Sequence, residues 1–330
     1  MSKKKTKVMA SRFRPVVYTE GELDKSDLTQ PPSKSNPHPL NLSNPSLFPP
    51  THSWSIAHYV NHLPVLQILV ELGVDLFEVL IYFMFTVSIL TFRFNWEKDV
   101  KPKLIWLVHQ VGMPISDVGS YLTRNPYFLL QSLENMQVRL NYLYAKRLCK
   151  TKVLKIVKNS RFWLNIDVTT TDSRLGWIQK TFELTGDEVR DVIVNEPRLI
   201  MYGIGPLERL VIMLTEEMEF TKEQVKAILM KDPRVFMIQS NALLSTFRYL
   251  RFTMNVTNAQ IAEWPVCLRF AVGAVRKRHE FLIRLNKADY IEGSPNYVPL
   301  SALLQPSDQK FAVNVAHTYL CVYNSFLKNY

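Results

Sequence analysis

Three threonines recur at an interval of 36 residues, and each heads a helix-start motif. Thr185, Thr221 and Thr257 are each followed three residues later by Glu or Gln. In this capping box the threonine hydroxyl accepts from the amide three residues on, and the Glu or Gln side chain reaches back to the threonine amide. We place Thr151 and Ser116 at the same phase, 34 and 35 residues further back. A helix start repeated at this interval predicts a chain of tandem units.

Each helix start is followed by an apolar stripe and then by a proline, as in NEPRLI at 195–200 and KDPRVF at 231–236. Proline lacks an amide hydrogen and crowds the preceding turn, so it ends the helix. We expect Ser160 to stand where one unit lacks its proline. The other units have Pro126, Pro197, Pro233 and Pro265.

A second helix is predicted to complete each unit, starting at Ser132, Asp172, Pro206 and Asn241. A unit of about 35 residues cannot bury its apolar face alone, so neighbouring units must stack. The sequence therefore predicts an all-α solenoid of helix–proline turn–helix repeats, a curved superhelix with a concave groove. A pentatricopeptide-like array that reads single-stranded RNA has a similar period, although the proline followed by an apolar pair argues against it.

The chain is expected to have three regions. Residues 1–53 are rich in Pro and Ser and open with MSKKKTKVMASRFR, which predicts a disordered leader with a mitochondrial targeting signal. A nuclear signal or a plain solvated tail remains an alternative for this stretch. Residues 54–290 are assigned to the repeat array and residues 291–330 to a C-terminal helical cap.

One stretch, residues 76–94, breaks the pattern because it carries no charge from Val79 to Phe92. These 14 residues are fewer than the roughly 20 that span a bilayer. We expect a buried helix and no stable membrane insertion, with a membrane span or a gene-model error as the alternatives.

The net charge of +11 favours a polyanionic partner. The densest basic run is 139–161, which holds eight cations and no acid. We expect three of its Lys and Arg side chains along one stripe of a second helix and three more on an adjoining face of the next first helix, where both sets could follow a phosphate backbone. The first stripe is Arg139, Lys146 and Lys150, the adjoining face is Lys152, Lys155 and Lys158, and the run also includes Arg147 and Arg161. A solvated surface is the alternative.

Arginines also recur with the repeat. One set lies near the start of the second helices (Arg139, Arg174, Arg209 and Arg278), and a pair follows the prolines (Arg198 and Arg234). Such arginines could contact successive phosphates or bridge neighbouring repeats by bonding carbonyls at helix ends. A second basic cluster comprises Arg269, Arg276, Lys277, Arg278 and Arg284.

Nothing in the sequence supports catalysis, a cofactor or a metal site. The three cysteines are scattered, and the seven histidines form no metal pair. His279 is expected to pack in the core, and GIGPLE at 203–208 is interpreted as a turn before Pro206. Aromatic residues beside the basic run could stack on bases, but at helical spacing they are expected in the core; they are Tyr142, Tyr144, Phe162 and Trp163.

Several motifs resemble the mitochondrial transcription termination factor (mTERF) family, and most of all its third subfamily. They are LGVD at 72–75, FNWEKDVKP at 94–102, SLENMQVRLNYL at 132–143, DSRLGWIQKTFEL at 172–184, NEPRLIMYG at 195–203, RKRHEFLIRLNKADY at 276–290 and PNYVPL at 295–300. The resemblance covers roughly residues 60–325 and implies a left-handed helical superhelix in mitochondria with a basic groove for double-stranded nucleic acid.

The function predicted from charge and resemblance together is non-catalytic nucleic-acid binding in the mitochondrial matrix. The resemblance implies mitochondrial double-stranded DNA, ribosomal RNA or both as the target, with transcription regulation, large ribosomal subunit biogenesis and ribosome assembly factors as its context. The other hypothesis is a protein-interaction scaffold in ribosome assembly, for which the charge serves only solubility and import. We expect a monomer.

Overall fold

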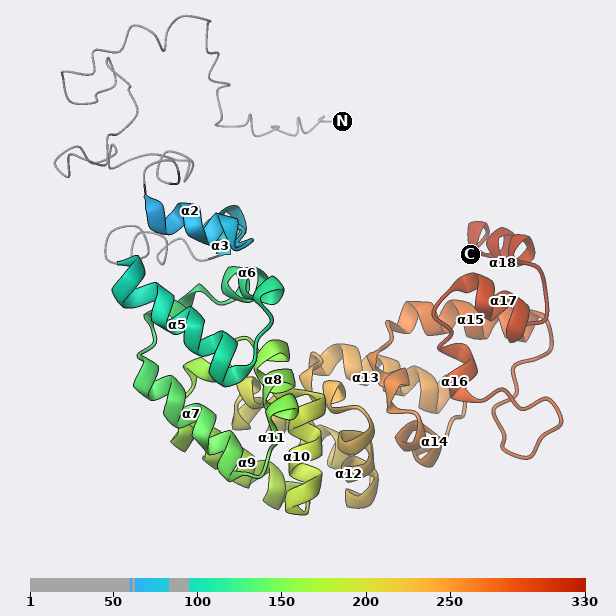
Figure 1. Ribbon diagram of the computed structural model, residues 1–330. Helices are drawn as coiled ribbons and strands as arrows, with labels where there is room; N and C mark the ends of the chain where they lie inside the picture. The colour runs from blue at the N-terminus through green and yellow to red at the C-terminus, as the bar shows by residue number, and fades with distance from the viewer. Residues whose placement is uncertain (1–59, 61–62, 83–94) are drawn as a thin grey trace, which may run out of the picture. The chain divides into compact units, whose positions relative to one another are not determined.

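The computed structural model describes residue 60 and residues 63–82 and 95–330 (Figure 1). Helices joined by turns and loops make up these residues, which include one isolated β-bridge, between Asp289 and Tyr297. The predicted all-α class is therefore confirmed. The expected leader at 1–53 and the uncharged residues 83–92 lie outside the described residues.

The described chain divides into two compact units, one containing residues 63–82, 95–101 and 118–123 and the other residues 102–117 and 124–330. The first unit contains α2 (Pro64–Glu71), α3 (Leu76–Tyr82), η2 (Trp96–Val100) and the middle of α6 (Ile115–Arg124). Leu76 and Val79 are buried, whereas Phe77 and Ile81 are 70% and 53% exposed. The start of the uncharged stretch therefore belongs to a helix that buries one face, and the buried helix expected over 76–94 stays a prediction. No described helix is both long and apolar enough to cross a membrane.

A glycine brings two helical segments of the first unit together. A Cβ on Gly119 of α6 would lie 2.1 Å from the Leu72 carbonyl oxygen and 2.5 Å from the Gly73 carbonyl carbon. Only glycine permits this approach of backbone to backbone. Beside it, the Asp75 amide donates to Thr123 Oγ1 at 2.9 Å, which closes the start of α3.

The second unit is a series of repeats, each with a first helix, a 3₁₀ turn and a second helix. The first helices are α8 (Lys150–Asn159), α10 (Gly186–Asn195), α12 (Lys222–Lys231) and α14 (Asn258–Glu263). The second helices are α7 (Leu133–Ala145), α9 (Val168–Thr181), α11 (Ile204–Ile212), α13 (Ser240–Arg248) and α15 (Val272–Arg284). The turns are η4 (Pro126–Leu130), η5 (Trp163–Asn165), η6 (Pro197–Tyr202), η8 (Pro233–Met237) and η10 (Pro265–Arg269).

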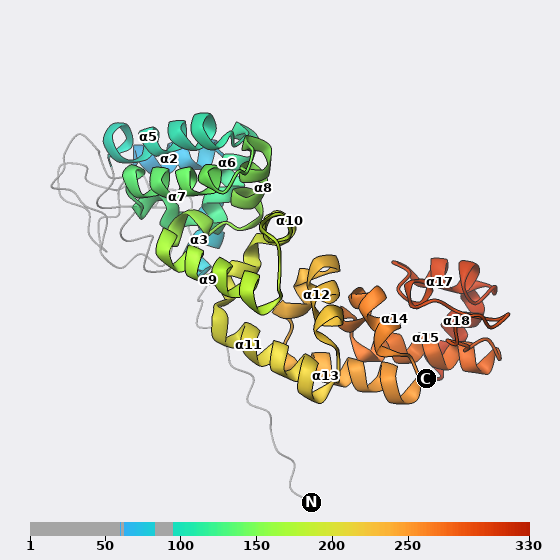
Figure 2. The same cartoon turned by 90° about the horizontal axis from the view of Figure 1, so that it is seen from below.

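Like elements stack on like elements in this unit. First helices contact in the order α8, α10, α12 and α14, and the turns η6, η8 and η10 also contact in order. Figure 2 shows α11, α13 and α15 along one side of this stretch, with α10, α12 and α14 along the other. The unit is therefore the solenoid that the repeats predicted, with two helical layers and a row of turns. The unit also contains η3 (Leu107–Val111) and all of α5 (Lys101–Trp106) except its first residue, and after the repeats it contains α16 (Leu300–Leu303), α17 (Asp308–Asn314) and α18 (Leu320–Lys328).

The three predicted capping boxes are present at Thr185, Thr221 and Thr257, each with both of its hydrogen bonds. The extrapolation to Thr151 was wrong, because the N-cap of α8 is Cys149, whose side chain makes no capping bond. Ser116 was also wrong, because α6 begins one residue earlier, at Ile115. These two helices start in register with the others, but their N-cap residues lack the hydroxyl group that would mark the helix start in the sequence.

The four predicted prolines each begin a 3₁₀ turn directly after a first helix, as expected. The prediction for Ser160 was wrong by one residue. Ser160 is the C-cap of α8, and therefore matches the residues that precede the prolines, Glu196 and Asp232. Arg161 stands where the other repeats have proline.

Of the second-helix starts, only Ser132 is confirmed, as the N-cap of α7. Asp172 was wrong, because Asp167 caps α9 by accepting from the Thr170 amide. Pro206 lies inside the first turn of α11, where a missing amide costs nothing, and GIGPLE is therefore the start of a helix. The N-cap of α13 is Gln239, two residues before the predicted start at Asn241.

A left-handed residue ends each of seven helical segments and turns the chain toward the next helix. Two of these residues are glycines and five carry side chains, with φ between 51° and 84°. They are Gly73, Gly112, Arg147, Glu183, Glu219, Asn255 and Asn286. From Gly112 to Asn255 they are 35 or 36 residues apart, so this conformation is a feature of the repeat.

Candidate nucleic-acid interface

Three arginines of the second helices bond to backbone carbonyls of the element that follows, a 3₁₀ turn for two of them and α16 for the third. Nη1 of Arg139 donates to the Leu164 carbonyl, Nη1 of Arg174 to the Ile200 carbonyl at 2.5 Å, and Nη1 of Arg278 to the Leu303 carbonyl at 2.6 Å. Each acceptor lies 25 or 26 residues downstream. The repeat-bridging hypothesis is confirmed for Arg139 and Arg174, whereas Arg278 makes the corresponding bond to α16, and each guanidinium satisfies a carbonyl at a helix or turn end.

Arg209 does not belong to this set. It is the sixth residue of α11, whereas the three bridging arginines are seventh in their helices, and the seventh residue of α11 is the buried Leu210. In α13 the seventh residue is Thr246, whose Oγ1 donates to the Phe270 carbonyl at 3.1 Å. Arg209 is exposed instead, so its location allows contact with a partner.

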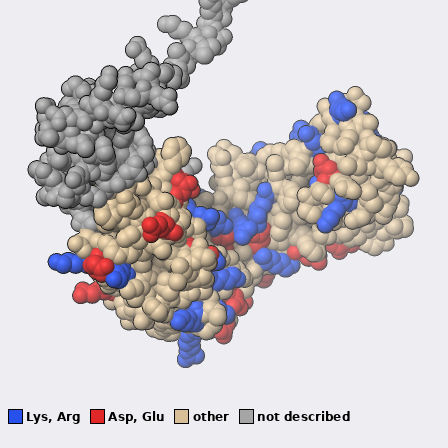
Figure 3. Space-filling view, turned by 45° about the horizontal axis from the view of Figure 1, so that its top comes forward, with Lys and Arg blue, Asp and Glu red and all other residues tan. Residues whose placement is uncertain are grey.

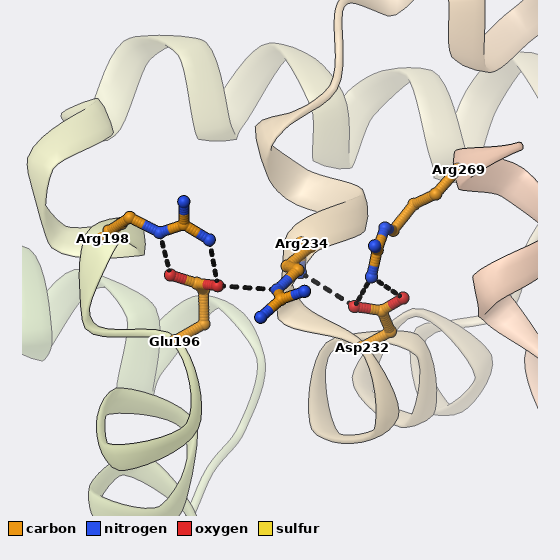
Figure 4. A network of polar contacts seen from close by, with 5 residues as sticks. All are labelled: Glu196, Arg198, Asp232, Arg234 and Arg269. Atoms are coloured by element: carbon orange, nitrogen blue, oxygen red, sulfur yellow. Dashed lines mark hydrogen bonds and ion pairs between the residues drawn. The ribbon is translucent and has the colours of Figure 1, made fainter. Parts of the chain in front are cut away.

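The arginines of the proline turns meet two buried carboxylates that precede prolines (Figure 4). Arg198 donates from Nε and Nη2 to the two oxygens of Glu196, at 2.6 and 2.7 Å. Arg234 donates from Nε to Oε2 of the same carboxylate at 2.9 Å. Arg269 donates from Nη1 to both oxygens of Asp232, at 3.0 and 2.8 Å. The row of turns is therefore linked across three repeats by arginine–carboxylate pairs.

This row combines buried anions with partly exposed cations. The Glu196 and Asp232 side chains are 3% and 6% exposed, and a buried carboxylate is tolerated only when it is paired. Burial raises the pKa of Glu196, but hydrogen bonds from Arg198 and Arg234 outweigh it and hold that pKa below its ordinary value. The same bond raises the pKa of Arg198. The side chains of Arg198, Arg234 and Arg269 are 49%, 52% and 31% exposed, so part of each arginine faces solvent.

The lysines of α8 share one exposed face, as predicted. Lys152, Lys155 and Lys158 are all exposed. Lys158 Nζ lies 2.6 Å from Oδ2 of Asp117, and Lys152 Nζ lies 3.6 Å from Oδ1 of Asp191. A lysine in an exposed pair of this kind can leave its carboxylate for another anion, because the pair stabilises the fold by only about 0–1 kcal/mol.

The predicted stripe of Arg139, Lys146 and Lys150 was wrong, because these residues do not share a helix. Lys146 is the C-cap of α7 and Lys150 is the first residue of α8. Lys146 Nζ pairs with Asp172 at 2.8 Å, and hydrogen bonds from Lys146 and then Tyr142 lower the pKa of that carboxyl. Lys150 Nζ donates to the His109 carbonyl at 3.2 Å.

Two further basic residues of the run lie at turns. Arg147 is exposed and holds the left-handed position after α7. The guanidinium carbon of exposed Arg161 is 4.9 Å from the centre of the Phe162 ring.

The second predicted cluster is divided by the structure. Arg278 is buried, and Arg269 belongs to the row of turns. Arg276 and Lys277 are exposed on α15, over the rings of Tyr249 at 5.3 Å and Tyr330 at 5.8 Å. The outward cations of this helix are therefore Arg276 and Lys277, joined in its last turn by Arg284.

The aromatic and histidine predictions have mixed outcomes. Trp163 is in the core as expected, whereas Tyr144 is 38% exposed, so its assignment to the core was wrong. Tyr142 and Phe162 are intermediate. His279 is buried, with Nδ1 2.8 Å from the Tyr290 hydroxyl, and burial lowers the pKa of its ring. It packs in the core as predicted.

Glu196 and Asp232 are the site residues that sequence reasoning missed. The acidic residue before each proline is visible in NEPRLI and KDPRVF, but only the arginine after the proline received a role. Figure 3 shows Lys and Arg side chains gathered toward the middle of the drawn face, with Asp and Glu side chains beside them.

The fold and these residues define a class, a helical-repeat array with arginines fixed at its turns and lysines exposed along one helix. The mTERF family model matches residues 55–219 and 141–312. The chain is 33% identical over 276 residues to Transcription termination factor 3, mitochondrial, of Drosophila melanogaster, covering 84% of this chain and 77% of that protein. The rat and mouse proteins of the same name are 35% and 34% identical over 279 residues, covering 84% of this chain and 68% and 67% of theirs.

The chain belongs to the mTERF family. The resemblance drawn from the motifs is confirmed, and so is the likeness to the third subfamily, since the three relatives carry that number in their names.

Proposed function

We propose that this chain is a non-catalytic regulator of mitochondrial transcription that binds double-stranded DNA in the matrix. The observation that carries the proposal is the exposed lysine face of α8, and exposed Arg147 and Arg161 lie just before and just after this helix in the sequence. Cations on adjoining elements suit successive phosphates of a duplex, and such contacts need no base identity. The relatives support DNA as the target because they are named transcription termination factors.

The test is the salt dependence of duplex binding. Each lysine that meets a phosphate releases counterions, so log affinity falls against log salt with a slope of about −0.9 per contact on B-form DNA. Replacing Lys152, Lys155 and Lys158 with Gln should make the slope shallower by about 2 to 3. The helix content and the melting temperature should change little, because exposed lysines contribute little to stability.

A matched control variant loses the same number of positive charges from three exposed lysines outside α8. Lys222, Lys310 and Lys328 are exposed and lie on α12, α17 and α18. Replacing these three with Gln should leave most of the slope intact. If the α8 variant and the control bind duplex DNA with the same slope as the parent, the α8 face is not the interface.

Crosslinking in mitochondria followed by sequencing identifies the working target. Recovery of mitochondrial DNA supports this proposal. Recovery of ribosomal RNA alone would move the proposal to ribosome biogenesis, and recovery of neither would favour the protein scaffold.

A further inference from the structure

Arg198 and Arg234 come from successive repeats but share one carboxylate. Oε2 of Glu196 accepts from Nη2 of Arg198 at 2.7 Å and from Nε of Arg234 at 2.9 Å. The two donor nitrogens therefore lie within 5.6 Å of each other, the sum of these two distances. Two guanidinium groups this close repel each other unless an anion lies between them, and Glu196 supplies it.

We call Arg198 and Arg234 the arginine doublet. The doublet arises from an irregularity in the repeat. Arg234 and Arg269 each reach back to the carboxylate before the proline of the preceding repeat, Glu196 and Asp232, which are 38 and 37 residues upstream. For Arg198, the corresponding residue 38 positions upstream is Ser160. Ser160 carries no charge, and its buried hydroxyl has no hydrogen-bond partner among the described residues. Arg198 instead pairs with Glu196 of its own repeat, which already holds Arg234.

The doublet faces outward while its anion is hidden. The Arg198 and Arg234 side chains are 49% and 52% exposed, and the Glu196 side chain is 3% exposed. Within the described part of the chain, the bonds to Glu196 leave Nη1 of Arg198 and both Nη groups of Arg234 unused. Two adjacent guanidinium groups thus present N–H groups to solvent from a fixed position. The side chains of Arg198, Arg234 and Glu196 together carry a net charge of +1.

The geometry points to the Arg198–Arg234 doublet as a clamp for a single phosphate group, with Glu196 as the residue that positions it. Guanidinium groups bind phosphate oxygens through pairs of charge-assisted hydrogen bonds. A rigid doublet loses less side-chain freedom on binding than two mobile arginines. This inference rests on the proposed function, since in duplex DNA the phosphate would belong to the backbone that the α8 face follows.

The decisive variant is Glu196→Gln, because the two possible roles predict opposite signs. If Glu196 only neutralises the surface, removing its charge raises the affinity for DNA. If it positions the doublet, the arginines separate and the affinity falls in spite of the added positive charge. We expect a fall of about threefold to tenfold for a mixed-sequence DNA duplex at 0.15 M salt, the size of one ordinary hydrogen bond.

Glu208→Gln is the matched control, since Glu208 is exposed on α11 and its loss changes the net charge equally. Its affinity should equal or slightly exceed that of the parent. Adding Arg198→Gln to the Glu196→Gln variant should cost little more, because the clamp is already open, whereas Arg198→Gln alone should cost as much as Glu196→Gln. An affinity of Glu196→Gln at or above that of Glu208→Gln would overturn the clamp.

A second variant keeps the inference testable if Glu196→Gln does not fold. Arg198→Lys preserves the charge and leaves Arg234 on Glu196, but it lacks the planar fork. We expect its affinity to fall by about threefold to tenfold with an unchanged salt slope. Arg190→Lys, at an arginine paired with Asp187 instead, should bind as the parent does.

Failure of the clamp and failure of the proposed function are distinguishable. If Arg198→Lys binds like the parent while the α8 lysine variant loses slope, only the clamp is wrong. If the parent chain itself shows no salt-dependent binding to duplex DNA, the proposed function fails first.

Discussion

Glu196 and Arg234 are 38 residues apart, and Nε of Arg234 donates to Oε2 of Glu196 at 2.9 Å across the boundary between two repeats. The carboxylate precedes one proline and the arginine follows the next. The proline turns thus end the first helices and also hold neighbouring repeats in register. Because Glu196 is buried, its ionisation is coupled to folding.

The first prediction concerns acid sensitivity. The pKa of Glu196 is lower in the folded state than in the unfolded chain. Its stabilising effect is therefore complete above the unfolded value of about 4.3 and is lost as the pH falls through the lower folded pKa. Glu196→Gln should lower the free energy of unfolding by about 1–3 kcal/mol at pH 7, and the difference from the parent should shrink below pH 4. Urea titrations at a series of pH values measure this, and a difference that stays constant from pH 7 to pH 3 would contradict it.

The second prediction uses the left-handed residues between repeats. Glu219 has φ 56°, which strains a residue with a Cβ by roughly 1–2 kcal/mol, whereas glycine adopts it freely. Glu219→Gly should raise the free energy of unfolding by about 0.5–1 kcal/mol after its larger loss of chain entropy. Glu217→Gly, two residues earlier in a helical turn, should lower it by about 1 kcal/mol. Thermal melts of both variants compare the two positions, and equal destabilisation would show that φ is not the deciding factor.

The sequence predicted those parts of the fold that depend on local chemistry. Thr185 and Thr221 indicate helix starts because each threonine hydroxyl and the Glu or Gln three residues later form the two hydrogen bonds of a capping box. The start of α8 was placed wrongly because Cys149 has no hydroxyl to signal the cap. The start of α9 was also placed wrongly although its cue is local: Asp167 accepts from the Thr170 amide, but the β-branched residues that follow it have low helix propensity.

The carboxylates of the proline turns were harder to predict than the arginines. A lone acid before a proline has no local role, and its partner is a repeat away. Finding that partner requires an alignment of the repeats that is exact to one residue. The prediction for Ser160 was one residue out of phase and therefore obscured it. Arginines carry charge that suggests a ligand, so Arg139, Arg174 and Arg278 could be identified, but whether each faced solvent or a carbonyl depended on packing.

The third prediction concerns a bridging arginine. Arg278 is buried and donates from Nη1 to the carbonyls of Leu303 and Gln305, at 2.6 and 2.8 Å. Arg278→Met keeps much of the volume but leaves these carbonyls unpaired, which should cost about 2–3 kcal/mol. Lys277→Met, at the exposed neighbouring position, should change the free energy of unfolding by less than about 0.5 kcal/mol. Urea titration compares the two, and a similar loss in both would rule out the bridging role.

The last prediction tests which residue of the turn after α8 stands in for proline. Ser160 has φ −119°, outside the range that proline adopts, and its amide donates to the Ile156 carbonyl at 2.8 Å. Ser160→Pro should therefore cost about 3 kcal/mol or more, through the lost bond and the clash with the preceding turn. Arg161 occupies the position that is Pro197 and Pro233 in the next two repeats, so the path of the chain there accepts proline. Arg161→Pro should stay within about 1 kcal/mol of the parent, because the stiffer unfolded chain offsets lost contacts. Thermal melts decide the matter: if Ser160→Pro is the better tolerated of the two, Ser160 rather than Arg161 holds the proline position of this repeat.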